Sequence, residues 1–274
     1  MNSQRLKLAL VAESTGLPLR TVLAKGSALG CKGIQFDAVG ELAPDQLTQT
    51  GRREFKNLLR SHNFELAALN VPLRRGLDVP EDLHPRLEFI RKAMALSYDL
   101  GASLVVAPFP ALPKSQDERD PRADALKESL TELGRFGDRT GCRLALEGGL
   151  DPGDALRAYL EPFDCGSLTV CYDPANFLLN GHDPLTSLTA LGRFASYCHA
   201  RDARAARNAG GGTEVPLGAG DIEWMAFIAT LESLAYSGYL AVERTAGTAR
   251  WDDVVAGVKV LGRFVPPDES ARRT

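Results

Sequence analysis

The chain has 274 residues, of which 44% are apolar and 24% are charged, and its formal net charge is -3. This is the composition of an ordinary globular protein, and the mild negative charge gives no reason to expect nucleic acid or an acidic membrane surface as a partner. No apolar stretch reaches the roughly 20 residues that a transmembrane helix needs. The apolar run near the N-terminus is too short for a signal peptide.

The five cysteines are widely spaced and form no CxxC pair. Two of them, Cys171 and Cys198, fall inside apolar runs, where a thiol behaves as a small buried apolar side chain. An odd number of cysteines without a disulfide framework is typical of a reducing compartment, so we expect a cytoplasmic protein.

Short apolar runs alternate with amphipathic segments along the whole chain. The apolar runs predict strands over residues 7–12, 33–37, 65–71, 103–107, 143–146, 170–172, 197–198 and 239–242. The segments between and after them predict helices over residues 18–29, 46–61, 82–100, 121–140, 154–160, 184–191, 222–235 and 251–264.

Punctuating residues support several of these boundaries. Pro121 stands at the favoured first position of a helix, Gly101 stands where a helix C-cap belongs, and Asp221 is expected to cap the helix that follows it. Residues 204–220, with glycines at 210–212, are expected to form a long mobile loop over the site.

Eight strand–helix units in strict alternation predict a parallel sheet. Strands that are apolar on both faces are typical of a sheet buried between a core and a layer of helices. No GxGxxG or Walker sequence is present to favour a nucleotide-binding fold. We therefore expect one α/β domain, a (β/α)8 TIM barrel over residues 1–265, followed by a C-terminal tail at 266–274.

Four consecutive strands end in residues that can bind a metal. Glu147, Asp173, His199 and Glu243 each follow an apolar run directly. The carboxyl ends of parallel strands share one face of a barrel, so these side chains should converge there. Three carboxylates and an imidazole, without a thiolate, suit one divalent ion such as Mn, Mg, Co or Zn.

These strand ends, together with YDPAN at 172–176, CHARD at 198–202 and VPLGAGDIEW at 215–224, resemble the xylose-isomerase-like TIM-barrel superfamily, the sugar phosphate isomerase/epimerase group. The resemblance covers nearly the whole chain. It implies that Glu147, Asp173, His199 and Glu243 bind one divalent metal, as the matching residues do in ketose 3-epimerases and inosose dehydratases. It does not specify the substrate.

Two departures from the superfamily limit what can be carried over. The epimerases commonly have a histidine three residues after the metal-binding aspartate, where this chain has Asn176. An amide can orient a hydroxyl group but cannot exchange a proton. In addition, the chain has only four histidines, and two of them, His62 and His84, fall in predicted helices. A trinuclear zinc cluster of the endonuclease IV type, and with it DNA repair, is therefore not expected.

Other polar residues near the strand ends are weaker candidates. Asn176 and Asp202 could contact a substrate or serve the surrounding structure. Arg244 could also bind substrate, although strand alternation points its side chain away from the barrel axis and favours an ion pair. Residues that end the first three predicted strands could line the pocket: Glu13, Asp37 and Asn70.

These residues predict a metal-dependent isomerase or epimerase of a sugar or sugar-like keto-polyol. Glu147 and Glu243 would remove and return a proton through a metal-bound enediolate. Two alternatives stay open: a dehydratase of an inosose-like keto-polyol, which expels a β-hydroxyl group from the same intermediate, and a non-catalytic sugar-binding barrel. The expected partner is a small sugar-like molecule, and the sequence leaves open whether the chain forms a homo-oligomer.

Overall fold

The computed structural model describes residues 6–114, 120–206 and 211–265. The tail expected at 266–274 and the glycine at position 210 lie outside the described residues. Within the described part of the chain, no helix combines the length and the apolar character that crossing a membrane requires.

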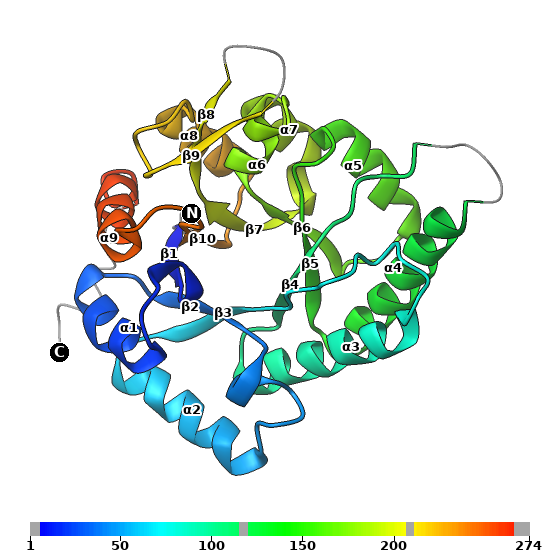
Figure 1. Cartoon of the computed structure of the whole chain (residues 1–274), viewed down its shortest axis with the longest axis horizontal. Coiled ribbons are helices and arrows are strands. Elements are labelled where there is room, and N and C mark those ends of the chain that lie inside the picture. Colours follow the sequence, from blue (N-terminus) through cyan, green and yellow to red (C-terminus); the bar gives the residue numbers. More distant parts are fainter. Residues whose placement is uncertain (1–5, 115–119, 207–210, 266–274) are drawn as a thin grey trace.

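Eight parallel strands close into a barrel, in the order β1-β10-β7-β6-β5-β4-β3-β2 (Figure 1). Sequence neighbours are also spatial neighbours until β7, which pairs with β10, and β10 closes the ring on β1. The barrel strands are β1 (Lys7–Val11), β2 (Gly33–Asp37), β3 (Glu65–Asn70), β4 (Leu104–Pro108), β5 (Arg143–Glu147), β6 (Leu168–Tyr172), β7 (Ala195–Ala200) and β10 (Tyr239–Val242). The predicted (β/α)8 barrel is thus confirmed.

Helices surround the strands in the order of the chain (Figure 1). They are α1 (Leu19–Gly26), α2 (Gln49–Ser61), α3 (Leu83–Leu100), α4 (Pro121–Thr140), α5 (Gly153–Leu160), α6 (Pro174–Leu179), α7 (Pro184–Leu191), α8 (Trp224–Ser233) and α9 (Arg250–Leu261). Short 3-10 turns lie at Glu13–Thr15, Ser27–Leu29, Gly40–Leu42, Glu161–Phe163 and Gly192–Phe194. Pro121 opens α4 and Gly101 follows α3 in a left-handed conformation, as predicted.

Two local expectations were wrong, and one helix was not expected. The segment after β7 is not a featureless loop, because β8 (Asp202–Ala205) and β9 (Gly212–Val215) pair in an antiparallel hairpin. Helix α6, which begins immediately after Asp173, was not predicted from the sequence. Asp221 does not cap α8: its carboxylate accepts a hydrogen bond from the backbone of Ala205 instead.

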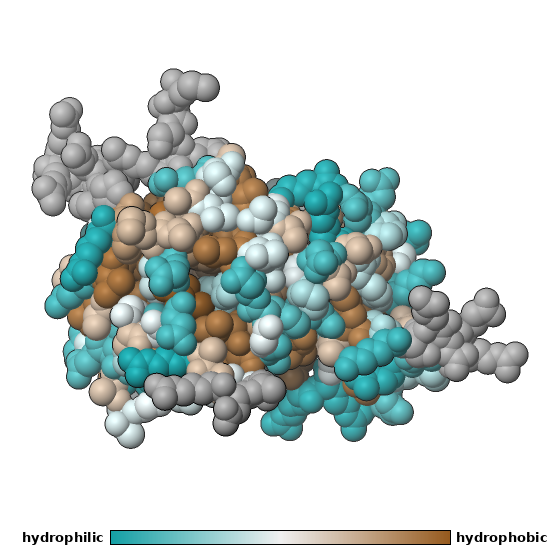
Figure 2. Space-filling model, turned by 90° about the horizontal axis from the view of Figure 1, so that it is seen from above, coloured by the Kyte–Doolittle hydropathy of each residue, from teal (hydrophilic) through white to brown (hydrophobic). Residues whose placement is uncertain are grey.

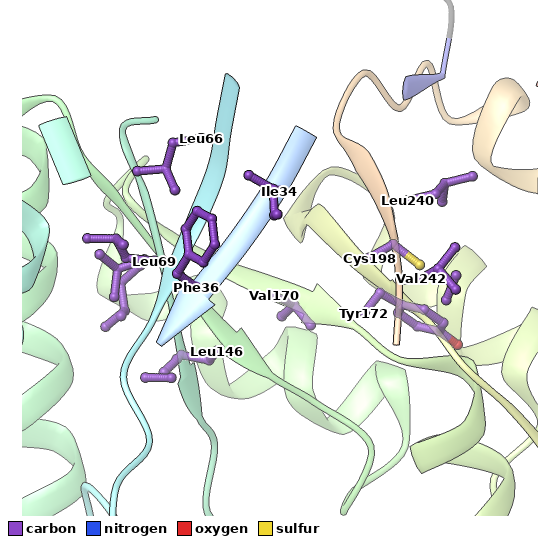
Figure 3. Close-up of a cluster of buried hydrophobic side chains, with 14 of the residues drawn as sticks. Ile34, Phe36, Leu66, Leu69, Leu146, Val170, Tyr172, Cys198, Leu240 and Val242 are labelled. Atoms are coloured by element: carbon purple, nitrogen blue, oxygen red, sulfur yellow. The ribbon is translucent and has the colours of Figure 1, made fainter. Parts of the chain in front are cut away.

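Strand alternation divides the buried side chains into two cores. An outer core joins the strands to the helices, and Figure 3 shows part of it. A smaller inner core fills the barrel and contains Ala145, Cys171, Tyr197 and Ala241. Because side chains two residues apart point to the same face of a strand, the residues two positions further along each of these strands also face the barrel axis.

The outer surface carries most of the charged residues. Figure 2 shows one face of the molecule, on which polar side chains dominate the margins and apolar side chains gather toward the middle. Among the described residues, four large apolar side chains are exposed: Val39, Tyr98, Leu150 and Met225. Two of them, Val39 and Leu150, follow the C-terminal ends of β2 and β5, on the face of the barrel where strand alternation places the candidate ligands.

Candidate metal centre

The four predicted ligands converge at the C-terminal face of the barrel. Glu147 is the last residue of β5, Asp173 follows β6, His199 lies near the end of β7, and Glu243 follows β10. Ligand atoms of the first three lie within 4.8 Å of one another. His199 Nδ1 lies 3.1 Å from Glu243 Oε2 and 4.0 Å from Glu147 Oε1. The strand alternation that fills the inner core therefore brings all four side chains together.

His199 presents a free ring nitrogen to the carboxylates. Its Nε2 lies 2.9 Å from the side-chain oxygen of Gln35, on β2. An amide oxygen can only accept, so Nε2 carries a proton and donates it to Gln35, and Nδ1 is the ring nitrogen that faces the carboxylates. Burial opposes a charged ring, but Cys171, Glu243 and Glu147 raise the pKa of His199 well above its ordinary value. Nδ1 and Glu243 Oε2 are both buried and, among the described residues, neither has a hydrogen-bond partner.

Asp173 is held from two sides. One carboxylate oxygen accepts hydrogen bonds from the backbone of Ala175 and Asn176, at 2.9 and 3.1 Å, and so caps α6. Pro174 occupies the first turn of this helix, where a missing N–H costs nothing. The other oxygen accepts from Arg201 Nε at 2.7 Å. The side chain is fully buried, and its position is fixed by backbone as well as by side-chain donors.

The two glutamates differ in their tendency to ionise. Burial opposes ionisation of Glu147, but hydrogen bonding and charge attraction from His199, with Arg201, outweigh it and hold its pKa below the ordinary value. Burial raises the pKa of Glu243, and the attraction of His199 and Arg201 does not compensate. Burial raises the pKa of Asp173 in the same way. Two carboxyl groups whose environments separate their pKa values are suited to opposite roles in proton transfer.

Asn176 lies within the centre rather than at its margin. Its side-chain nitrogen donates to Glu147 Oε1 at 3.1 Å, and its oxygen accepts from Arg201 Nη2. The amide therefore links a carboxylate to a guanidinium group and orients both. A contact between Asn176 and a substrate stays a prediction.

Arg201 and Gln35 are the two site residues that sequence reasoning missed. Arg201 stands two positions after His199, so strand alternation turns it to the same side, but nothing in the sequence shows that it contacts the candidate ligands. Gln35 carried a signal, because a polar residue in the middle of an otherwise apolar strand needs a buried partner. Its neighbours Ile34 and Phe36 belong to the outer core, which turns Gln35 toward the barrel axis.

Asp202 organises the loop that precedes α8. Its carboxylate accepts hydrogen bonds from Trp224 Nε1 at 2.9 Å and from four backbone N–H groups, those of Ala203, Gly218, Gly220 and Ile222. The residue is 1% exposed. These contacts support the structural alternative for Asp202 and leave its carboxylate no open side for contact with a substrate.

Arg244 points outward, as strand alternation predicts. Its guanidinium donates to Asp253 on α9 at 3.0 Å and to Glu214 on β9 at 2.8 Å. Glu214 also accepts from the backbone N–H of Thr245 at 2.9 Å. These contacts form a structural ion-pair network that fixes the hairpin beside β10, and they use the groups that a substrate would need.

The residues that end the first three strands form a second polar row. Glu13 Oε1 accepts from the backbone N–H of Asp37 at 2.8 Å, and Asn70 donates to Asp37 Oδ1 at 2.7 Å. Burial, followed by the nearby charge of Asp37, raises the pKa of Glu13 to about 7. Burial raises the pKa of Asp37, and the hydrogen bond from Asn70 and the nearby charge of His199 oppose this only in part, so the row adjoins the candidate metal centre.

The arrangement of donor atoms suits a divalent cation. Three carboxylates and one imidazole nitrogen are a hard, mixed oxygen and nitrogen set. The strongest indication comes from His199 Nδ1 and Glu243 Oε2, which are buried 3.1 Å apart without forming a hydrogen bond, because buried polar atoms in proteins almost always have hydrogen-bond partners. The bond from His199 to Gln35 matches the outer contact that usually fixes a metal-binding imidazole.

Solved structures of similar fold include three that cover the chain almost completely. A xylose isomerase domain protein from Planctomyces limnophilus is 20% identical, with a TM-score of 0.81 over 95% of this chain and 98% of that one. A xylose isomerase-like TIM barrel protein from Mycobacterium smegmatis, solved with magnesium, is 16% identical, with a TM-score of 0.75 over 97% and 98%. A 3-keto-D-glucoside 4-epimerase from E. coli is 16% identical, with a TM-score of 0.72 over 93% and 100%.

At these identities the similarity shows a shared fold, and no curated protein matches the sequence. The family itself is shown by a sequence model described as xylose isomerase-like TIM barrel, which matches residues 23–263. This match spans every barrel strand except β1. The chain belongs to the xylose isomerase-like TIM barrel family.

Proposed function

We propose that this protein is a divalent-metal-dependent isomerase or epimerase of a sugar-like keto-polyol. The observation that carries the proposal is the convergence of Glu147, Asp173, His199 and Glu243, with unpaired buried atoms on His199 and Glu243. The magnesium in one structural relative and the epimerase activity named for another support the same assignment.

Glu147, Asp173, His199 and Glu243 would hold the ion. When bound, a divalent ion polarises a substrate carbonyl group and stabilises the negative charge that develops on proton loss. The set does not choose between Mn, Mg, Co and Zn, because each accepts oxygen and imidazole ligands and geometry decides among them.

The two glutamates divide the proton transfer. Glu147, whose pKa is lowered, is ionised at neutral pH and serves as the base that removes a proton from the carbon beside the carbonyl. Glu243, whose pKa is raised, retains a proton more readily and returns one to the other side of the planar intermediate. They stand at the ends of β5 and β10, with β6 and β7 between them in the barrel. This separation supports a base and an acid on different sides of a bound substrate.

Asn176 orients the base Glu147, and it does not take over proton transfer from the histidine that related epimerases have at this position. Its amide donates to Glu147 Oε1 and keeps that oxygen directed into the centre. Because an amide cannot exchange a proton, the proton transfers are assigned to the glutamates alone.

Dehydration is the second candidate and uses the same residues. After Glu147 removes the proton, the intermediate can expel a β-hydroxyl group instead of regaining a proton, and Glu243 would then protonate the departing oxygen. The solved structures of similar fold include a probable 3-DHS dehydratase from Bacillus anthracis. Epimerisation is preferred because a separate acid on another strand suits return of the proton to carbon.

The first experiment measures the metal. Purified protein would be stripped with chelator, reloaded with Mn²⁺ and assayed for bound metal per chain. His199→Ala should reduce the stoichiometry well below one, since it removes the one nitrogen ligand. His182→Ala is the matched control, because that ring lies in a loop beside the carbonyl oxygen of Leu150. Full metal content in the His199 variant would contradict the proposed site.

The second experiment measures the reaction. The Mn²⁺-loaded protein would be incubated in D₂O with a panel of ketoses and keto-polyols and followed by NMR. Incorporation of deuterium beside the carbonyl, with a new epimer or isomer, is the expected result. Loss of water with a new absorbance from a conjugated carbonyl would select dehydration. Neither exchange nor product across the panel, with metal bound, would favour the sugar-binding alternative.

A further inference from the structure

Arg201 places a positive charge inside the candidate metal centre. The residue joins β7 to β8 and is 8% exposed. Its Nε lies 2.7 Å from Asp173 Oδ2 and 3.7 Å from Glu243 Oε2. Two of the four proposed ligands are thus already in contact with a cation that belongs to the protein.

The remaining donors of Arg201 are also satisfied within the chain. Nη1 donates to Thr245 Oγ1 at 3.3 Å and lies 3.5 Å from Glu214 Oε2, and Nη2 donates to Asn176. The guanidinium group therefore makes its hydrogen bonds and ion pairs with residues that follow β6, lie on β9 or follow β10. It is not placed as an open receptor for a substrate carboxylate or phosphate.

This charge has two opposite effects. It stabilises the fold, because buried carboxylates that face one another repel unless a cation lies between them. It also opposes a second cation at the same ligands: a unit charge within about 4–6 Å changes proton affinity by about one to three pKa units. A divalent ion carries twice the charge of a proton and should respond at least as strongly.

The positions of the ligands do not depend on Arg201 alone. Asp173 is fixed by the backbone N–H groups of Ala175 and Asn176, and His199 is fixed by Gln35. Removing the guanidinium charge should therefore leave the ligands near their places. The affinity gained by removing the positive charge should then exceed any affinity lost because the ligands are held less firmly.

We infer that Arg201 is a resident cation of the centre, a positioning residue that stabilises the metal-free fold and weakens the affinity for the divalent ion. The inference rests on the proposed function, since it takes Glu147, Asp173, His199 and Glu243 as metal ligands. In physical terms Arg201 keeps the carboxylates together and makes the metal easier to release.

The test is a titration with Mn²⁺ alone, in which the EPR signal of the free ion reports the dissociation constant without any substrate. Arg201→Met removes the charge at similar length and should bind Mn²⁺ at least about tenfold more tightly than the wild type. Arg201→Lys keeps a charge in place and should stay within a few fold of the wild type. Equal or weaker binding in the methionine variant would overturn the inference.

Glu214→Gln keeps Arg201 in place and is expected to change the affinity for Mn²⁺ in the opposite direction. Glu214 contacts Arg201 but is not a proposed ligand, so neutralising it leaves more of the positive charge of Arg201 uncompensated. The affinity of the Glu214→Gln variant for Mn²⁺ should therefore be several fold lower than that of the wild type. An unchanged or tighter dissociation constant would overturn the inference even if Arg201→Met does not fold.

Thermal unfolding supplies the second readout. With chelator present, Arg201→Met should unfold at a lower temperature than the wild type, and Mn²⁺ should raise its midpoint by more than it raises that of the wild type. A smaller rise would contradict the inference. If the wild type itself binds no Mn²⁺, the proposed function fails. If the wild type binds and the variants do not differ, only the role of Arg201 fails.

Discussion

Gln35 Oε1 and His199 Nε2 lie 2.9 Å apart in the barrel interior, although 164 positions separate them in the chain. Gln35 is on β2 and His199 on β7, with β1 and β10 between them in the closed sheet. The hydrogen bond therefore reaches across the barrel rather than between neighbouring strands. It decides which ring nitrogen of His199 faces the carboxylates. Gln35, which is not a proposed ligand, thus helps to orient the candidate metal centre.

Replacing Gln35 by leucine should weaken metal binding. The change keeps the approximate size of the side chain but removes the acceptor that holds the proton on Nε2, and losses of this kind typically cost about 10- to 100-fold in metal affinity. The dissociation constant for Mn²⁺, measured by EPR, checks this expectation. Gln35→Glu is the matched comparison, since it retains an acceptor at the same place and adds a negative charge, so it should bind Mn²⁺ at least as tightly as the wild type. Identical affinities for Gln35→Leu and the wild type would show that the contact does not orient the ligand.

Replacing Asp202 by asparagine should destabilise the fold. Five donors converge on this carboxylate, and an amide would direct its own N–H₂ group at some of them. Leaving buried donors without an acceptor costs about 1–3 kcal/mol for each group that finds no other partner, so a loss of about 2–4 kcal/mol in unfolding free energy is expected. Urea unfolding provides the measurement.

The control for Asp202 is Asp221→Asn, which alters a single hydrogen bond to the exposed backbone N–H of Ala205 and should cost less. If Asp202 serves the loop, the substrate KM of the folded Asp202 variant should stay near the wild-type value. A large rise in KM with unchanged stability would restore the substrate contact that the sequence also allowed.

The sequence was sufficient for the barrel and for the convergence of the four candidate ligands at one face, because both depend on local regularities. Alternation of apolar runs with amphipathic segments specifies the order of strands and helices. The period of two along a strand then decides which residues face the axis. Glu147 and Glu243 were predictable because each continues an apolar run, and parallel strands place their ends on one face.

Arg201 and the hairpin of β8 and β9 could not be predicted by the same reasoning. The contacts of Arg201 with Asp173, Glu214 and Thr245 span separations of 13 to 44 residues, and these residues meet only in the folded chain. The hairpin strands are short and polar, with the pattern of an exposed loop. Helix α6 is only six residues long and starts on the Asp-Pro pair at 173–174, which is equally typical of a turn.

Glu13 should make the stability of the protein depend on pH near neutrality. Its pKa is raised from 4.5 to about 7, so the folded state holds a proton that the unfolded state releases. The resulting stabilisation is fully present below the unfolded value of 4.5 and is lost as pH rises through about 7. Because the side chain is solvent-accessible, screening limits the effect to about 1 kcal/mol.

Urea unfolding of the wild type and Glu13→Gln between about pH 4.5 and 8 measures this contribution. Glutamine keeps the acceptor for the backbone N–H of Asp37 but does not titrate. The wild type should lose stability relative to the variant as the pH rises, and Glu54→Gln, on the exposed side of α2, should follow the wild type. Parallel curves for the wild type and Glu13→Gln would show that the carboxyl group does not titrate in this range.

Glu147 and Glu243 are expected to have separate roles in proton transfer. If they are the proton-transfer pair, replacing either by glutamine keeps the size of the side chain and one oxygen for the metal but removes an acid or base. The loss of a positioned acid or base typically costs about 10²–10⁴ in rate. Overall turnover should therefore fall in both variants, and by this reasoning turnover alone does not separate them.

Solvent exchange separates them, because the two glutamates act on different sides of the intermediate. Glu243→Gln keeps the ionised Glu147, so it should still exchange the proton of one epimer in D₂O without completing the inversion. Glu147→Gln should exchange only the opposite epimer. The measurement is NMR of each epimer at matched Mn²⁺ occupancy. If both variants lose exchange of both epimers while metal stays bound, the two glutamates do not work as separate bases and the two-base scheme is wrong.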